Sequence, residues 1–326
     1  MGERVLVTGA TGFIGSHLVE ELVWHGYEVV ALVRTSSNLR WLKGKKVEFI
    51  YGDLMEGEDI PHLNGFSYVF HLAGVTKALH KRDFYRINYG GTEKLIAEVN
   101  RAGGIKRFVY LSSLAAAGPS SPERARSEED APSPVSPYGE SKLNGEEVVL
   151  SYRDKIPVTL LRPCAVYGPR DEYMYECFRM VSKGFIPFIG RGSAFLSLCF
   201  VDDLISALIL AIRQEHPSGE VFHISDGEKY SLDFFMYMIS SFLKIKARKI
   251  YIPVWAAWLY ALTSESWGVM RGIAVSFNRS KCVEAIQRNW VCDITKAKKK
   301  LGFRPRFRLE AGLKVTLQWY KDKGWL

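Results

Sequence analysis

Short apolar runs alternate with helix-like amphipathic stretches through about residue 168. The runs are rich in β-branched residues, as is typical of strands buried on both faces. Helical patterns separate several of them, including Phe84 to Arg101. This alternation predicts an α/β fold with a doubly wound parallel sheet. The expected strands are 4–8, 28–33, 47–51, 67–72, 107–112 and 157–162, with a further strand at Val221 to Ile224 that returns to the sheet.

Three glycines lie where the first strand gives way to the first helix. The helix is indicated by Ile14, Leu18 and Leu22 at intervals of four, and Gly26 is expected to end it. In a Rossmann fold such glycines allow a tight turn, a close approach of backbone to a pyrophosphate, and close packing of helix on strand. The helix N-terminus supplies N–H groups to the phosphates. The spacing is G-x-x-G-x-x-G; an ordinary turn is the alternative, but the strand before and the helix after favour dinucleotide binding. The residues expected at the cofactor are Gly9, Thr11, Gly12, Phe13, Ile14 and Gly15.

The second strand, Glu28 to Val33, ends in Arg34. An acid at this place binds the ribose 2′-hydroxyl of NAD, whereas an arginine suits the 2′-phosphate of NADP. Residues 35–38 add further hydroxyl and amide donors. A solvated arginine at a strand end is the alternative. We expect NADP to be preferred, with NAD possible.

A serine pair and a Tyr-x-x-x-Lys segment supply candidate acid–base chemistry. Ser136 and Pro137 are a favourable helix start, so Tyr138 and Lys142 would share one helix face. A free tyrosine has a pKa of about 10, and a nearby ammonium and a cationic nicotinamide would lower it. The pair Ser112-Ser113 follows the strand at 107–112, at the sheet edge where ligands bind.

Taken together, these segments resemble the extended short-chain dehydrogenase/reductases, the NAD-dependent epimerase/dehydratase superfamily. The pattern is closest to members similar to 3β-hydroxysteroid dehydrogenase and dihydroflavonol reductase. The resemblance runs nearly end to end. It includes T-G-A-T-G-F-I-G at 8–15, G-D-L at 52–54, H-L-A-G at 71–74, L-S-S at 111–113, Y-G-E-S-K at 138–142, L-R-P at 161–163, Y-G-P-R at 167–170 and V-D-D at 201–203.

The resemblance implies roles for individual residues. Ser113 matches the catalytic hydroxyl, Tyr138 the general acid/base, and Lys142 the residue that holds the nicotinamide ribose and lowers the tyrosine pKa. Further cofactor contacts are implied for Ser112, Asp53, Leu54, Leu72, Ala73, Gly74 and Pro163. Structural alternatives are a turn-forming role for Asp53 and close packing for Ala73 and Gly74.

The domain organisation follows from the same pattern. Residues 1–168 are expected to form the NAD(P)-binding Rossmann domain, to which 197–224 return. Residues 169–326 are expected to form mostly a smaller C-terminal substrate-binding domain. Residues 119–137, rich in Pro, Ser and charge, are expected to be a loop near the site.

The composition indicates which location and which partners to expect. Hydrophobic residues make up 47% of 326, no apolar run is long enough to cross a bilayer, and no charged-then-apolar leader is recognisable. Five cysteines without a Cys-x-x-Cys argue for free thiols in a reducing compartment, hence a cytoplasmic location, and no metal-site spacing is present. The net charge of +9 is dispersed, and Lys298 to Lys300 is interpreted as a solvated helix face, so no nucleic-acid partner is expected. A small-molecule substrate and a homodimer are expected.

The substrate is less strongly indicated. We favour reversible oxidation or reduction of a secondary alcohol or ketone, with a nucleotide-sugar epimerase or 4-ketoreductase as the alternative. Where sugar-nucleotide relatives carry Asn and an Arg-Asp pair, this chain has Ala165, Leu196 and Ser197, although Arg170, Arg191 and Arg279 could compensate. A non-catalytic NADP sensor is a remote third possibility, since Tyr138 and Lys142 are both present. The aromatic-rich segment 251–278 could line an apolar pocket or touch a membrane surface, but ordinary packing of a helix is favoured.

Overall fold

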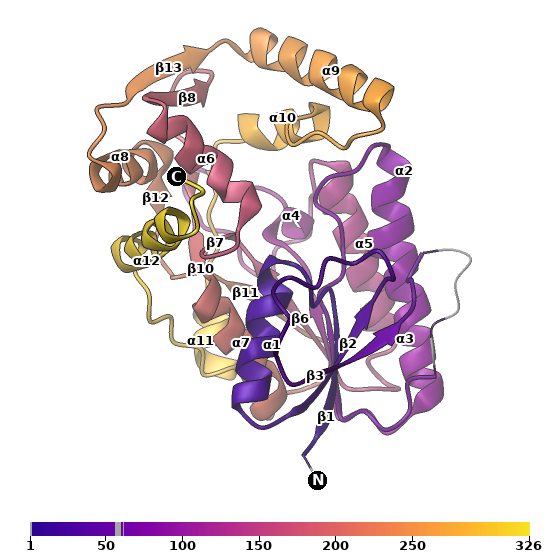
Figure 1. Cartoon of the computed structure of the whole chain (residues 1–326). Helices are drawn as coiled ribbons and strands as arrows, with labels where there is room; N and C mark the ends of the chain where they lie inside the picture. The colour runs from indigo at the N-terminus through magenta and orange to yellow at the C-terminus, as the bar shows by residue number, and fades with distance from the viewer. Residues whose placement is uncertain (1, 56–59, 61) are drawn as a thin grey trace.

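The computed structural model describes residues 2–55, 60 and 62–326 (Figure 1). Its centre is a seven-stranded parallel sheet in the order β11-β6-β5-β4-β1-β2-β3. The order reverses between β1 and β4, which is the topological switch point of a doubly wound sheet. The strands are β1 (Arg4–Thr8), β2 (Glu28–Val33), β3 (Val47–Tyr51), β4 (Tyr68–His71), β5 (Arg107–Leu111), β6 (Val158–Pro163) and β11 (Glu220–Ile224).

Two apolar layers enclose this sheet because alternate side chains of each strand point to opposite faces. Val5 and Val7 of β1 belong to the core on one face, and Leu6 belongs to the core on the other. The first face is covered by α1 (Phe13–Trp24) and α7 (Val201–Arg213), and the second by α3 (Gly91–Ala102) and α5 (Pro137–Ser151). The continuous apolar runs of the sequence are therefore strands buried on both sides.

The predicted strands and the start of α5 are confirmed. Ser136 caps α5 by accepting a hydrogen bond from the Gly139 N–H at 3.1 Å, and Pro137 occupies the first turn. Gly26 follows α1 with a φ of +81°, as expected of a helix-ending glycine. The segment expected as one helix from Phe84 is subdivided into α2 (Lys81–Phe84), a π-helical turn η1 (Tyr85–Gly90) and α3. A π-turn adds a residue to one turn, which a 3.6-residue periodicity does not reveal.

The remaining elements form a second lobe beside the carboxyl ends of the sheet strands (Figure 1). Its small sheets pair β10 with β7, β12 with β9 and β14, and β13 with β8. The strands are β7 (Ala165–Tyr167), β8 (Phe185–Ile189), β9 (Phe195–Leu196), β10 (Leu198–Phe200), β12 (Tyr230–Ser231), β13 (Arg248–Ile252) and β14 (Asn289–Trp290). The helices outside the main layers are α4 (Leu114–Ala117), α6 (Glu172–Ser182), α8 (Leu232–Leu243), α9 (Val254–Arg271), α10 (Arg279–Ile286), α11 (Thr295–Lys300) and α12 (Leu309–Asp322).

Candidate active site

The glycine turn between β1 and α1 is closely packed. Gly9 has a φ of +69°, and a Cβ on it would lie 2.7 Å from the Ala73 backbone nitrogen of the neighbouring strand end. A Cβ on Gly15 would lie 2.1 Å from the Gly9 carbonyl oxygen. Both positions therefore exclude a side chain, and α1 begins directly against the turn.

A hollow of about 260 Å³ opens at the carboxyl ends of β1, β2 and β4, at the switch point of the sheet. Of the residues expected at the cofactor, those that line it are Gly9, Thr11, Gly12, Arg34, Asp53, Leu54, Leu72, Ala73 and Gly74. The sequence analysis did not assign a cofactor contact to other lining residues, namely Thr8, Leu32, Val33, Gly52, Met55, Val75 and Ile87. Thr8 and Gly52 lie within the motifs at 8–15 and 52–54, whereas the other five are apolar and no motif marks them in advance.

Other expected cofactor residues lie outside that lining. Phe13, Ile14 and Gly15 form the first turn of α1 next to the hollow. Pro163 ends β6 and pairs with Ile224 of β11. Their contacts with a cofactor stay predictions.

Arg34 and Ser37 lie together at the rim of the hollow. The Arg34 N–H donates to the Ser37 hydroxyl at 3.0 Å, which folds the chain after β2 into a turn. The Arg34 side chain is exposed, and no ion pair involves it within the described residues. Asp53 has a structural role as well as its place in the lining, because its carboxylate accepts from the Met55 N–H at 3.0 Å.

Ser113 and Tyr138 meet at the carboxyl end of β5. Ser113 is the N-cap of α4, and its hydroxyl accepts from the Ala115 N–H at 3.1 Å. Burial raises the pKa of Tyr138, while Lys281 and a hydrogen bond with the Ser113 side chain lower it. The two hydroxyl groups expected to act together are thus brought into contact, although they are far apart in sequence.

The side chain of Lys142 lies at the carboxyl end of β5, near Gly74 of the hollow. Its ammonium donates to the Leu111 carbonyl at 2.7 Å and lies 4.2 Å from the ring centroid of Tyr110. A Cβ built on Gly74, which lines the hollow, would be 3.9 Å from the same Nζ. Burial lowers the pKa of Lys142 to about 7, and Glu146 opposes this shift.

The expected electrostatics of Tyr138 need a correction. The sequence analysis gave the role of lowering the tyrosine pKa to Lys142, yet the ammonium that lowers it in this structure is Lys281 of α10, and burial outweighs that effect. Lys281 Nζ lies 5.1 Å from the ring centroids of Tyr138 and of Tyr173, and it binds Glu284 at 2.7 Å. Lys281 was missed because it comes from the second lobe, 143 positions after Tyr138, and no local pattern links the two.

Ser112 belongs to a buried polar network. Its hydroxyl donates to Glu146, whose carboxylate also accepts two hydrogen bonds from Arg162, at 2.8 and 2.6 Å. All three side chains are buried. The Ser112 hydroxyl therefore already donates its proton to Glu146 of α5. A contact with the nicotinamide would have to come from other atoms of Ser112.

His71 has a structural role. Its two ring nitrogens lie 2.7 Å from the Thr8 hydroxyl and 2.9 Å from the Thr92 hydroxyl. Burial, with a smaller contribution from Lys142, lowers the pKa of His71 to about 3, so the ring is neutral. The network ties β1, β4 and α3 together beneath the hollow.

The cations suggested as diphosphate ligands are largely engaged elsewhere. Arg170 donates to Ser16 at 3.1 Å and to Glu20 at 2.8 and 3.0 Å, and Arg279 binds Glu265 at 2.9 and 3.0 Å. The Ser197 hydroxyl donates to the Glu228 carbonyl at 3.3 Å and accepts from the Cys292 N–H at 3.3 Å. Arg170 therefore fastens the second lobe to α1, and the other two side chains make contacts within that lobe. The third suggested cation, Arg191, is exposed and has no ion pair among the described residues.

Two searches of the described residues gave negative results. No group of three or more His, Cys, Asp and Glu side chains is arranged to hold a metal ion. None of the helices in that part of the chain is both long and apolar enough to cross a membrane.

Comparisons with known proteins agree with this geometry. The sequence matches the model of the NAD dependent epimerase/dehydratase family over residues 5–225. It is 30% identical to a decarboxylating sterol-4-alpha-carboxylate 3-dehydrogenase of Mus musculus, over 98% of this chain and 93% of that protein. It is 29% identical to a ceramide reductase of Caulobacter vibrioides, over 99% and 96%. Among solved structures, MoeE5 in complex with UDP-glucuronic acid and NAD superposes with a TM-score of 0.78 and 26% identity, over 98% and 99%.

Proposed function

Because the chain belongs to the NAD-dependent epimerase/dehydratase family, we propose that it interconverts a secondary alcohol and a ketone by hydride transfer. The chain is an NAD-dependent oxidoreductase of that superfamily. The observation that carries the finer proposal is the contact between Ser113 and Tyr138. It lies beside Lys142, which reaches the edge of the nucleotide hollow at Gly74.

The residues around the hollow fit a nicotinamide dinucleotide. The first N–H groups of α1 have no partners within the helix, and they face the space after the glycine turn, where a pyrophosphate would bind. Apolar side chains of β2 and β4 and the Asp53-Leu54 turn supply the walls for an adenosine. When bound, the cofactor supplies the site that accepts or donates hydride.

The chain's own residues handle the proton. Tyr138 gives its phenolic proton to a ketone oxygen or takes the proton of an alcohol, and the Ser113 hydroxyl holds that oxygen in place. Lys142 would hold the nicotinamide ribose and contribute positive charge from its place against the Leu111 carbonyl. Tyr138 is half-buried, and burial raises the pKa of its phenol, which favours the protonated form that reduction of a ketone needs.

Replacement of Tyr138 by Phe tests this proposal. We expect Tyr138→Phe to lower kcat by about 10²–10⁴, since only proton transfer is lost, while the Kd of the cofactor stays within about twofold. Oxidation of a panel of 3β-hydroxysteroids and other apolar secondary alcohols, followed by cofactor absorbance, measures kcat. Tyr152→Phe, at the far end of α5, is the matched control and should keep full activity. A Tyr138→Phe enzyme with near wild-type kcat would refute the assignment.

We also propose that NADP is preferred over NAD. The support is Arg34 beside Ser37 at the rim of the hollow, exposed and without an ion pair to any residue that the structure describes. Arg34→Ala should weaken NADPH binding by about 1.5–3 kcal/mol and leave NADH binding nearly unchanged, because only NADPH carries the 2′-phosphate. Calorimetric titration of both cofactors measures this. Equal wild-type affinities for NADPH and NADH would contradict it.

The proposed substrate is an apolar, lipid-like alcohol or ketone. Two relatives are named for a sterol and a ceramide, and in this chain Arg170, Arg279 and Ser197 are engaged within the protein. A nucleotide-sugar epimerase or 4-ketoreductase is the second candidate, favoured by the likeness to MoeE5 with UDP-glucuronic acid. The division into cofactor and substrate domains at residue 168, a homodimer and a cytoplasmic location are further parts of the proposal.

A further inference from the structure

Helix α9 has an unusual distribution of side chains. Its buried residues are the small ones, Ala257, Ala261 and Gly268. Its large apolar side chains face outwards, with Trp255 70%, Tyr260 62% and Met270 81% exposed. A helix that only covers a core buries its large apolar residues instead. Ordinary packing, the favoured expectation, therefore accounts for these small residues and for the half-buried Trp258, but not for the exposed side chains.

The exposed apolar residues form one continuous face. One row consists of Trp255, Leu259, Leu262 and Met270. These residues are separated by four, three and eight positions, intervals that place them on one side of a helix. Tyr260 and Trp267 form an adjacent row. Glu265 lies at the side and pairs with Arg279, so the face carries no acidic group. We call this surface the α9 face.

A strongly basic segment leads into the α9 face. Residues 234–283 contain seven Lys and Arg residues and a single acid, Glu265. Lys244, Lys246 and Arg248 are exposed just before the helix, and no ion pair involves them in the described part of the chain. Exposed Ile250 and Tyr251 join them to α9.

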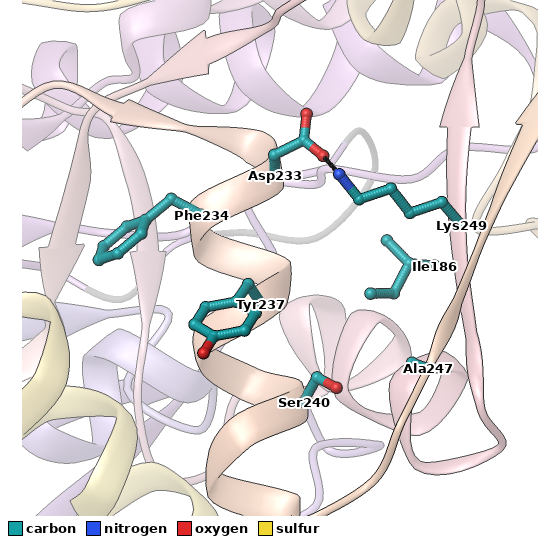
Figure 2. Close-up of a pocket in the computed structure, with 7 residues that line it drawn as sticks. All are labelled: Ile186, Asp233, Phe234, Tyr237, Ser240, Ala247 and Lys249. Carbon is teal, nitrogen blue, oxygen red and sulfur yellow. Dashed lines mark hydrogen bonds and ion pairs between the residues drawn. The ribbon is translucent and has the colours of Figure 1, made fainter.

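Lys249 differs from its neighbours. Figure 2 shows it reaching from β13 to Asp233 at the start of α8, beside a hollow of about 330 Å³. This ion pair fastens β13 to α8, whereas Lys244, Lys246 and Arg248 are exposed to solvent.

The position of α9 leaves its apolar face open. β13 leads into α9, which forms the outer edge of the second lobe, with α10 beneath it (Figure 1). Ala257 and Ala261 pack against Cys282 of α10, and the preceding residue, Lys281, lies over the Tyr138 ring. One helix therefore separates the α9 face from the candidate catalytic group.

We propose that the α9 face docks on an anionic lipid surface. The helix axis would lie in the plane of the interface, with Trp255, Leu259 and Met270 below the headgroups. Lys244, Lys246 and Arg248 would contact the anionic headgroups. Self-association of the same face would bring together two segments rich in cations, which is unfavourable. This inference goes beyond the proposed reaction and holds whatever the substrate is.

Vesicle sedimentation of the full-length protein tests the proposal. The probes are vesicles of phosphatidylcholine alone and vesicles containing about one quarter phosphatidylglycerol. We expect binding to the anionic vesicles, weaker binding to the neutral ones, and a loss of binding at about 0.5 M salt.

Two pairs of surface variants separate the apolar and basic contributions. The double variant Trp255→Ser, Trp267→Ser should weaken partition to anionic vesicles at least about tenfold. The control variant Trp24→Ser, at a similarly exposed tryptophan of α1, should change partition less than about twofold. Lys246→Gln with Arg248→Gln should also weaken it about tenfold. The matched control is Lys298→Gln with Lys299→Gln in α11, which should have little effect.

Three results would overturn the proposal. One is the absence of binding to anionic vesicles by wild-type protein that is folded by circular dichroism. Another is equal weakening by the control variants. The third is a wild-type protein that binds no vesicles and is a dimer by analytical ultracentrifugation, with the dimer lost in the Trp255→Ser, Trp267→Ser double variant. The α9 face would then be a contact between two copies of the chain. Tyr138→Phe should bind vesicles normally, so failure of the reaction and failure of docking are distinguishable.

Discussion

The ionisation of Tyr138 is set by opposing contributions from its surroundings. Burial raises its pKa most, Lys281 and Ser113 lower it, and Glu284 raises it again. In alcohol oxidation the phenol must lose its proton to act as a base, so the rate should rise with pH as Tyr138 ionises. Lys281, by favouring the phenolate, should place this rise at lower pH than burial alone would.

Removal of the Lys281 charge tests that balance. Lys281→Met should raise the pKa of Tyr138 further, because Glu284 then faces the phenol without its partner. The rise of kcat in the oxidation direction should move to higher pH by about 0.5–1 unit. The pH–rate profile measures this shift, and Lys281→Arg should restore the wild-type profile. An unchanged profile for Lys281→Met would show that the ammonium does not act on Tyr138.

At the level of elements, α5 is fastened to the sheet by a buried ion pair. Glu146 of α5 accepts from Arg162 of β6 and from Ser112, which follows β5. Because Tyr138 and Lys142 lie on the same helix, this pair also fixes the height of the catalytic group above the sheet. A buried pair adds little net stability, but loss of one partner leaves the other charge uncompensated.

Disruption of that pair should be costly. Arg162→Met should lower the free energy of unfolding by about 3–5 kcal/mol, and the double variant with Glu146→Met should recover much of the loss, since no buried charge is left alone. Denaturant unfolding measures both. Arg179→Met, which breaks an exposed pair with Glu176, is the control and should cost less than about 1 kcal/mol. Equal stabilities of the single and double variants would contradict this account.

At the level of the whole molecule, the second lobe determines what can bind over the sheet edge. Arg170 holds the chain after β7 to α1 through Glu20, and Arg279 holds α10 to α9 through Glu265. A diphosphate requires several convergent donors or cations, and these two are already paired. Binding of a nucleotide sugar would have to break ion pairs that connect the lobe to its neighbours.

Sugar nucleotides should therefore bind weakly. With NADP present, calorimetry with UDP, GDP and dTDP sugars should give Kd values of about 1 mM or weaker, because Arg170 and Arg279 are already engaged in ion pairs. An apolar alcohol from the turnover panel is the positive control. Micromolar binding of any of these sugars would promote the epimerase alternative.

The sequence by itself determined the sheet and the nucleotide turn. Their signals are local: β-branched runs at 4–8 and 28–33, and glycines at positions where a Cβ would strike neighbouring backbone. Family motifs also marked Ser113, Tyr138 and Lys142, and the structure places the three close to one another at the end of β5.

Only the tertiary structure decided which charges face which groups. Lys281 acts on Tyr138, Glu146 holds Ser112 and Arg162, and the large side chains of α9 face outwards, although the composition of 251–278 suggested ordinary packing. Each depends on contacts between segments far apart in the chain or on the side of a helix that its neighbours leave uncovered. Electrostatic interactions act through space, and burial depends on the surrounding elements, so neither can be read from the order of residues alone.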